Sequence, residues 1–186
     1  EDKFSKFIGS KYSISCNSGT DALVLSLRAL DIGHGDEVIT SPFTYFATAE
    51  AIVLVGAKPV FADIDPRTFN IDYRNIEKYI NKRTKAIMPV HLFGQSAEIT
   101  QIKKLCSKHR LKLIEDCAQS FGSTKNKKHT GTFGDFGCFS FFPTKNLGCA
   151  GDGGMITTDS LTKMKKLKKL RNHGGLVRNI HEYIGY

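Results

Sequence analysis

Short apolar runs alternate with amphipathic segments along most of this chain, and this alternation constrains its fold more than any other feature. The apolar runs are rich in Val, Ile and Phe, which is typical of buried strands. Strands are predicted at Tyr12–Cys16, Glu37–Ser41, Lys58–Ala62, Lys85–Val90, Lys112–Asp116, Gly137–Phe142 and Gly154–Thr157. Helices are predicted at Thr20–Leu30, Tyr45–Val55, Asp72–Asn81, Glu98–His109 and Ser160–Asn172. This alternation predicts an α/β fold, with a mostly parallel sheet and helices on both faces.

The pattern changes after Asp116, because helical periodicity is absent between Gly122 and Gly154 and glycine is dense there. The last two predicted strands run through this segment. A long irregular stretch inside a compact domain is usually functional, so we expect part of a site here.

The chain has 186 residues, which corresponds to one domain. No apolar stretch approaches the roughly 20 residues needed to span a bilayer, so a membrane-spanning protein is excluded. No basic segment followed by an apolar run opens the chain, so we expect a cytoplasmic protein. Because residue 1 is Glu, we expect the natural start to be missing. The five cysteines show no CxxC spacing, which predicts free, buried thiols and no metal site.

The formal net charge of +9 raises the possibility of nucleic-acid binding, but the distribution of the charges argues against it. Nine basic residues lie in the stretches 125–128 and 163–171, and without them 18 basic and 18 acidic residues balance. In the second stretch an apolar residue recurs every third position, from Leu161 to Leu170. We interpret it as one helix with a solvated, lysine-rich outer face.

Ligands of open α/β sheets bind beyond the carboxyl ends of the strands, so the residues that follow each strand are the candidates. After the first strand, Gly19 and Thr20 open a helix where their amides and the Thr20 hydroxyl could hold a phosphate. Plain helix capping by Asn17 or Ser18 explains the same residues without a ligand. After the second strand, one of three aromatic residues within 43–46 could stack on a planar ring, or all three could pack in the core.

The fifth and sixth strands deliver the most reactive groups. Glu115 and Asp116 end an apolar strand, so one of them could face solvent or cap a helix while the other pairs with a ligand cation. Lys145 follows an uncharged, aromatic strand and precedes a glycine-rich turn. It is either a lysine that reaches the surface or one that forms a Schiff base. A lysine, a carboxylate, a phosphate cradle and an aromatic face together fit pyridoxal phosphate (PLP).

These motifs resemble those of the DegT/DnrJ/EryC1/StrS family of sugar aminotransferases, a branch of the fold-type I, aspartate aminotransferase-like PLP enzymes. The matching runs cover nearly the whole chain in order. They are 17–23, 35–38, 42–48, 56–61, 89–94, 115–119, 139–148, 152–154 and 171–174.

The resemblance implies a role for each residue of a PLP site. Lys145 would carry the cofactor and shuttle protons, and Asp116 would pair with its pyridinium nitrogen. Tyr45 would stack on the ring, and Gln119 would lie near the phenolic oxygen. The residues implied for the phosphate are Gly19, Thr20 and Ser140. The choice of Gln119 and Ser140 depends on the resemblance alone, and His91 matches a family position without an assigned role.

The resemblance also implies the activity and the assembly. Residues 1–186 would be the large PLP-binding domain, incomplete, with the extreme N-terminus and a smaller C-terminal domain absent. The expected reaction moves an amino group, with glutamate as the expected donor, to a keto group of a nucleotide-linked deoxysugar for polysaccharide biosynthesis. The expected unit is a homodimer with the active site at its interface, where an asparagine just beyond Tyr186 reaches the neighbouring subunit's phosphate. The alternatives are a pyridoxamine-dependent sugar dehydratase, which would have histidine at Lys145, and a regulatory relative without turnover.

Overall fold

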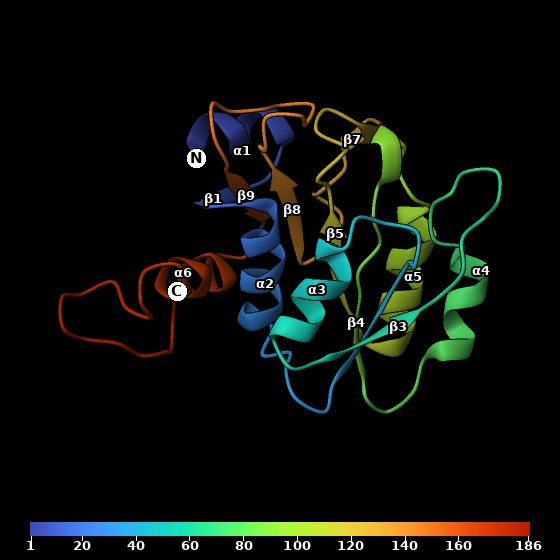
Figure 1. Cartoon of the computed structure of the whole chain (residues 1–186), viewed down its shortest axis with the longest axis horizontal. Coiled ribbons are helices and arrows are strands. Elements are labelled where there is room, and N and C mark those ends of the chain that lie inside the picture. The colour runs from blue at the N-terminus through green and yellow to red at the C-terminus, as the bar shows by residue number, and fades with distance from the viewer.

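The computed structural model describes all residues from Glu1 to Tyr186, and its centre is a seven-stranded sheet in the order β1-β9-β8-β5-β4-β2-β3 (Figure 1). The strands of the sheet are β1 (Tyr12–Cys16), β2 (Glu37–Thr40), β3 (Lys58–Phe61), β4 (Thr84–Ile87), β5 (Lys112–Asp116), β8 (Phe136–Ser140) and β9 (Gly154–Thr158). Strands β8, β5, β4, β2 and β3 pair in parallel, and β9 runs antiparallel to both of its neighbours. The sheet is therefore mostly parallel, as predicted.

Helices cover both faces of this sheet. They are α1 (Asp2–Ile8), α2 (Gly19–Ala29), α3 (Ala47–Leu54), α4 (Tyr73–Ile76), α5 (Ile99–His109) and α6 (Leu161–Leu170), with 3-10 turns η1 (Glu77–Tyr79) and η2 (Leu92–Gly94). Side chains of α2, α3 and α6 pack in one core, and those of α4 and α5 pack in another. Neighbouring strand residues point to opposite faces, so Val38 joins the first core and Ile39 the second. The expected α/β architecture is confirmed.

The predicted helices and strands all have counterparts, and the differences lie in short elements. The helix predicted at Asp72–Asn81 is one turn of α4 followed by η1. The sequence analysis missed α1, a seven-residue helix whose Phe4 ring packs edge-on against Phe139 at 5.1 Å between centroids. It also missed a hairpin of β6 (Thr124–Lys125) and β7 (Lys128–His129). Elements this short have too few residues to show a periodicity.

The glycines of the irregular segment serve close packing in its first half. A Cβ on Gly134 would lie 2.4 Å from the carbonyl oxygen of Leu113, and one on Gly137 would lie 2.3 Å from Cα of Gly131. The backbone of 131–137 therefore lies directly against itself and against β5. The expectation of a site in this stretch applies only to its second half, which contains Lys145.

Charge and cysteine placement follow the sequence analysis with three exceptions. The apolar face of α6 is buried at Leu167 and Leu170, but Leu161 is exposed, while lysines of its outer face form ion pairs with acidic residues of other segments. All five cysteines are free thiols, but only three are buried, because Cys16 is half-buried and Cys149 is exposed. None of the helices is both long and apolar enough to cross a membrane.

Candidate active site

A cavity of about 450 Å³ lies at the carboxyl edge of the sheet, the edge toward which the β8 arrow points in Figure 1. The start of α2, the segment before α3, the end of β5 and the end of β8 with its following loop form its walls. Every residue to which the resemblance gives a role in the PLP site lines it. These residues are Gly19, Thr20, Tyr45, Asp116, Gln119, Ser140 and Lys145.

The first turn of α2 and the end of β8 form a cradle in this cavity. Ser18 caps the helix by accepting a hydrogen bond from the Asp21 N–H at 2.9 Å, which leaves the amides of Gly19 and Thr20 without a partner inside the helix. A Cβ on Gly19 would lie only 2.6 Å from Cβ of Ser140. Glycine is therefore required for the Ser140 hydroxyl to lie beside these amides. Two amides and two hydroxyls at a helix N-terminus are a donor set that fits a phosphate.

Asp116 is a buried carboxyl group with room for one more partner. Its Oδ2 accepts a hydrogen bond from the Thr48 hydroxyl at 2.8 Å, and its Oδ1 accepts one from the Ala118 N–H at 3.1 Å. Burial raises the pKa of Asp116 above its ordinary value, and these two hydrogen bonds oppose the rise only in part. No cationic group is hydrogen-bonded to it, so the site fits a ligand that brings a protonated nitrogen.

The two adjacent acids of β5 are separated by the sheet. Asp116 points to the face covered by α3, whereas Glu115 points to the opposite face and does not line the cavity. The expectation that the second acid faces solvent or caps a helix is wrong, because Glu115 is 0% exposed. Its carboxylate accepts hydrogen bonds from the backbone amides of Gly131, Phe133 and Gly134 and pairs with His91.

Lys145 lies in the loop after β8 and faces the aromatic residue predicted for ring stacking. Its Nζ is 5.8 Å from the centroid of the Tyr45 ring, and none of the ion pairs of the chain includes it. The loop turns back at once, because the Lys145 N–H donates to the Phe142 carbonyl at 2.8 Å. Lys145 is also the only basic residue of the cavity lining, so the cradle has no cation of its own.

A long-range hydrogen bond determines which end of the Gln119 amide faces the cavity. Its Oε1 accepts a hydrogen bond from the Phe93 N–H at 2.8 Å, so its Nε2 is left for the cavity. Reasoning from the residues alone missed Gln119, Ser140 and Thr48. Gln119 lies just beyond the end of β5, Ser140 is the last residue of β8, and Thr48 lies inside α3. No local pattern marks any of the three as a hydrogen-bonding group of the site.

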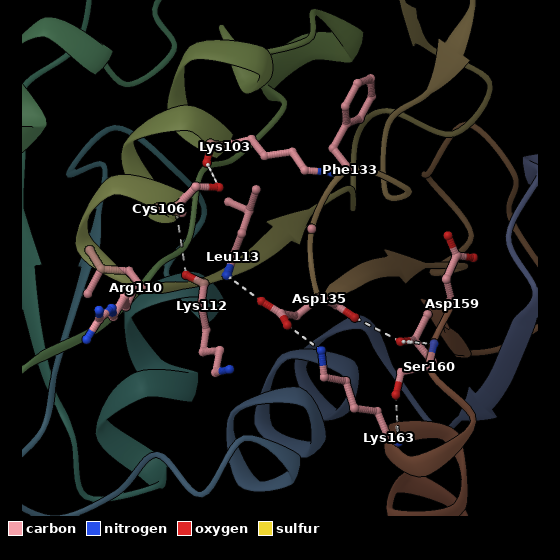
Figure 2. A pocket seen from close by; sticks show the side chains of 14 residues that line it. Lys103, Cys106, Arg110, Lys112, Leu113, Phe133, Asp135, Asp159, Ser160 and Lys163 are labelled. Carbon is pink, nitrogen blue, oxygen red and sulfur yellow. Dashed lines mark hydrogen bonds and ion pairs between the residues drawn. The ribbon is translucent and has the colours of Figure 1, made fainter.

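A second cavity, of about 570 Å³, opens at the opposite edge of the sheet, near the start of β5 (Figure 2). Four basic and two acidic side chains line it. They are Lys103, Arg110, Lys112, Lys163, Asp135 and Asp159.

Known proteins resemble this chain over its whole length. The DegT/DnrJ/EryC1/StrS aminotransferase family matches residues 1–186. The UDP-N-acetyl-3-dehydro-alpha-D-glucosamine 3-aminotransferase of Acidithiobacillus ferrooxidans is 53% identical over 178 residues, which are 96% of this chain and 48% of that protein. The UDP-2-acetamido-2-deoxy-3-oxo-D-glucuronate aminotransferase of Pseudomonas aeruginosa is 48% identical over 185 residues, which are 100% of this chain and 52% of that protein. The chain thus spans about half the length of the curated relatives it matches.

Solved structures give the same result. A DegT DnrJ EryC1 StrS aminotransferase from Brucella abortus matches 100% of this chain and 52% of its own with a TM-score of 0.97 and 39% identity. NtdA from Bacillus subtilis with bound cofactor PMP matches 100% of this chain and 43% of its own, with a TM-score of 0.93 and 36% identity. By sequence and by structure, the chain belongs to the DegT/DnrJ/EryC1/StrS aminotransferase family.

Proposed function

We propose that this chain is the cofactor-binding part of a PLP-dependent aminotransferase that moves an amino group to a keto group of a nucleotide-linked sugar. The observation that carries the proposal is one cavity that holds an unpaired lysine, a buried carboxyl group and a phosphate cradle. The names of the two relatives above, both aminotransferases of UDP-linked sugars, support this substrate class. Glutamate is the proposed amino donor.

The catalytic roles are assigned to two of the titratable groups of the cavity, Lys145 and Asp116. PLP supplies an aldehyde that captures amines and a ring that accepts electrons from a deprotonating carbon. Lys145 would hold the cofactor through Nζ and then move a proton at the carbon that carries the amino group. Asp116 would keep a proton on the ring nitrogen, because an opposite charge beside it favours the charged form. Thr48 and the Ala118 amide would hold Asp116 in place for this contact.

The remaining residues would bind and orient. The amides of Gly19 and Thr20, with the hydroxyls of Thr20 and Ser140, would hold the phosphate. Tyr45 would cover one face of the ring, and the Nε2 of Gln119 would donate to the phenolic oxygen.

A partner subunit would complete this site. Two amides and two hydroxyls neutralise only part of a dianionic phosphate, and the one basic residue of the cavity is committed to the aldehyde. A further donor must come from elsewhere, and we propose a homodimer in which the neighbouring chain supplies it. We also propose that residues 1–186 are the large domain of a longer protein, because relatives are about twice as long.

Reduction with borohydride tests the cofactor assignment. After incubation with PLP and reduction, peptide mapping of the longer protein should place the pyridoxyl label on Lys145. Lys163, in the cavity at the opposite edge, is the internal control and should stay unlabelled. A label on another lysine would refute the assignment.

Assays with a panel of nucleotide-linked keto sugars and glutamate then test the reaction. Amination of one sugar supports the proposal, and Lys145 already argues against a dehydratase. A label on Lys145 without amination of any sugar would favour the regulatory alternative.

A titration tests the shared site. Residues 1–186 alone are expected to bind PLP more weakly than the longer protein, because the partner's donor is missing. Equal affinity, with the short chain shown to be monomeric, would mean that one chain completes the phosphate site.

A further inference from the structure

Three buried polar side chains outside the cavity lining are joined by hydrogen bonds to the segment 91–97 or to one another. His91 and Glu115 are 0% exposed, and Asn70 is 3% exposed. None of them takes part in the roles proposed above. Buried polar groups are costly unless they are hydrogen-bonded, so their partners indicate what they hold in place.

The hydrogen bonds of His91 fix both nitrogens of its ring. Nδ1 accepts from the Ala97 N–H at 3.0 Å, so this nitrogen carries a lone pair and the proton lies on Nε2. Nε2 therefore donates to Oε2 of Glu115 at 3.0 Å. Cys117 lies within 4.8 Å of these groups, but no ring nitrogen is free to bind a metal ion. The arrangement is a clamp on the segment between His91 and Ala97.

Asn70 holds the same segment from the other side. Its Oδ1 accepts from the Leu92 N–H at 3.0 Å, and its Nδ2 donates to the Gln95 carbonyl at 3.1 Å. Between these two bonds, Phe93 adopts a φ of 55°, in the left-handed region that a residue with a Cβ seldom occupies. A strained residue keeps such a conformation only where its surroundings determine it. Asn70 and His91 are those surroundings.

This conformation aims the Phe93 N–H at Oε1 of Gln119, 2.8 Å away. A backbone N–H meets only an acceptor, so the contact fixes the oxygen of the amide and leaves its NH2 as the group available to the cavity. Without the contact, the amide could rotate and present its oxygen to the phenolic oxygen of PLP, where two acceptors repel.

We propose that His91 and Asn70 are positioning residues that act through the Phe93 N–H to keep the NH2 of Gln119 directed into the cavity. The inference rests on the proposed function, because it gives that NH2 the phenolic oxygen as its partner. It assigns a role to His91 and adds Asn70 and Phe93 to the groups that determine how the cofactor is bound.

The test is the absorbance of bound PLP in the longer protein as the pH changes. A hydrogen-bond donor to the phenolic oxygen of PLP stabilises the ionised form of that oxygen. Removing the donor therefore raises the midpoint, the pH at which the change in PLP absorbance is half complete. We expect Gln119→Leu to raise the midpoint by about one pH unit. Asn70→Ala should raise it in the same direction by roughly half a unit, because the amide then samples both orientations.

Combining the variants separates positioning from general destabilisation. In the Gln119→Leu background, Asn70→Ala should add no further shift, because the group it positions is gone. Asn81→Ala is the matched control, since it removes the Asn81 hydrogen bond to Glu37 at 2.7 Å outside the cavity and should leave the midpoint unchanged. His91→Asn keeps an acceptor for Ala97 and should shift the midpoint less than His91→Leu.

Each contrary outcome has a distinct meaning. Additive shifts, or an unshifted midpoint in Asn70→Ala where Gln119→Leu shifts it, would overturn the positioning role and leave the proposed function intact. Absence of any PLP spectrum in the unaltered protein would overturn the proposed function, and this inference with it.

Discussion

The cavities at the two edges of the sheet differ in how their polar groups are used. At the edge shown in Figure 2, Asp135 forms an ion pair with Lys163 and accepts the Leu113 N–H at 2.9 Å, while the Ser160 hydroxyl caps α6. The charged groups of this wall are either paired with each other or exposed to solvent. At the carboxyl edge, Asp116 is buried without a cation and Lys145 has no ion-pair partner.

The difference shows that volume does not identify a site in this fold. The cavity of about 570 Å³ at the amino edge is larger than the one of about 450 Å³ at the carboxyl edge. The smaller cavity is distinguished by Asp116, which is buried without a cation, and by Lys145, which has no ion-pair partner. Such unpaired groups are typical of a site where a ligand supplies the missing partner.

The largest difference is expected when one lysine of each cavity is replaced by alanine. Lys145→Ala should lower turnover of the longer protein about a thousandfold or more, because it removes the amine that we propose holds the cofactor and moves the proton. Lys103→Ala, in the amino-edge cavity, should leave turnover unchanged. Steady-state kinetics of both variants measure the contrast. Substantial turnover in Lys145→Ala would mean that the carboxyl-edge cavity is not the catalytic one.

The two buried or half-buried aspartates provide the next contrast. Asp116→Asn should keep PLP bound but lower turnover about a hundredfold or more, because an amide no longer favours the protonated ring nitrogen. Asp135→Asn loses the ion pair with Lys163 and should lower the thermal midpoint without changing turnover. The comparison fails if Asp135→Asn has the larger effect on turnover.

Close packing at the cradle predicts a smaller loss. Gly19→Ala would place a Cβ 2.6 Å from that of Ser140, and such overpacking costs about 1–3 kcal/mol. Its main effect should fall on the phosphate site, as a roughly tenfold or greater loss of PLP affinity, since one tenfold step corresponds to about 1.4 kcal/mol. Gly33→Ala is the matched control, because its Cβ would lie 3.4 Å from the nearest atom. Fluorescence titration with PLP distinguishes the two variants.

The smallest effect is a pH dependence of stability in the cofactor-free protein. Burial raises the pKa of Asp116, so the folded state binds this proton more tightly than the unfolded state does. Stability from this group is therefore present at low pH and is lost as the pH rises through the folded-state pKa. Asp116→Asn removes the loss, so its urea midpoint should exceed that of the unaltered protein increasingly as the pH rises from 4 to 8. The exposed control Asp63→Asn should show no such trend. A difference independent of pH would contradict the assigned cause.

Much of the fold could be predicted because strands and helices of ordinary length carry a periodicity. Each strand of the sheet could be predicted from its own residues. Lys145 and Asp116 could be identified as candidates because each lies at or just after the end of a predicted strand. Ser140 and Gln119 came through the family resemblance, since a serine after a phenylalanine or a glutamine in a loop has no local signature. Thr48, Asn70 and Phe93 could not be predicted, because their partners lie 68, 22 and 26 residues away along the chain.

The glycines show the same limit. Their density after Asp116 indicated a functional stretch, but the Gly131 and Gly134 amides enclose Glu115 instead of a ligand. A glycine needed for close packing and one needed for a ligand are identical in the sequence. Only the position of the opposing atoms separates the two.

The place of β1 at the edge of the sheet has a consequence for how the protein is made. This strand pairs only with β9, with Tyr12 opposite Thr158 and Cys16 opposite Gly154. The first strand of the sheet to be synthesised therefore cannot pair until the last one has been synthesised. Contacts of such sequence separation slow folding, because a long loop must close before they form. The start of α2 follows β1 directly, and a Cβ on Gly154 would meet the Ser18 carbonyl at 2.1 Å. Strand β9 lies between β1 and β8 in the sheet, so the start of α2 and the end of β8, which form the proposed phosphate cradle, are held side by side only once this last strand is in place. We therefore expect the cradle to form late in folding.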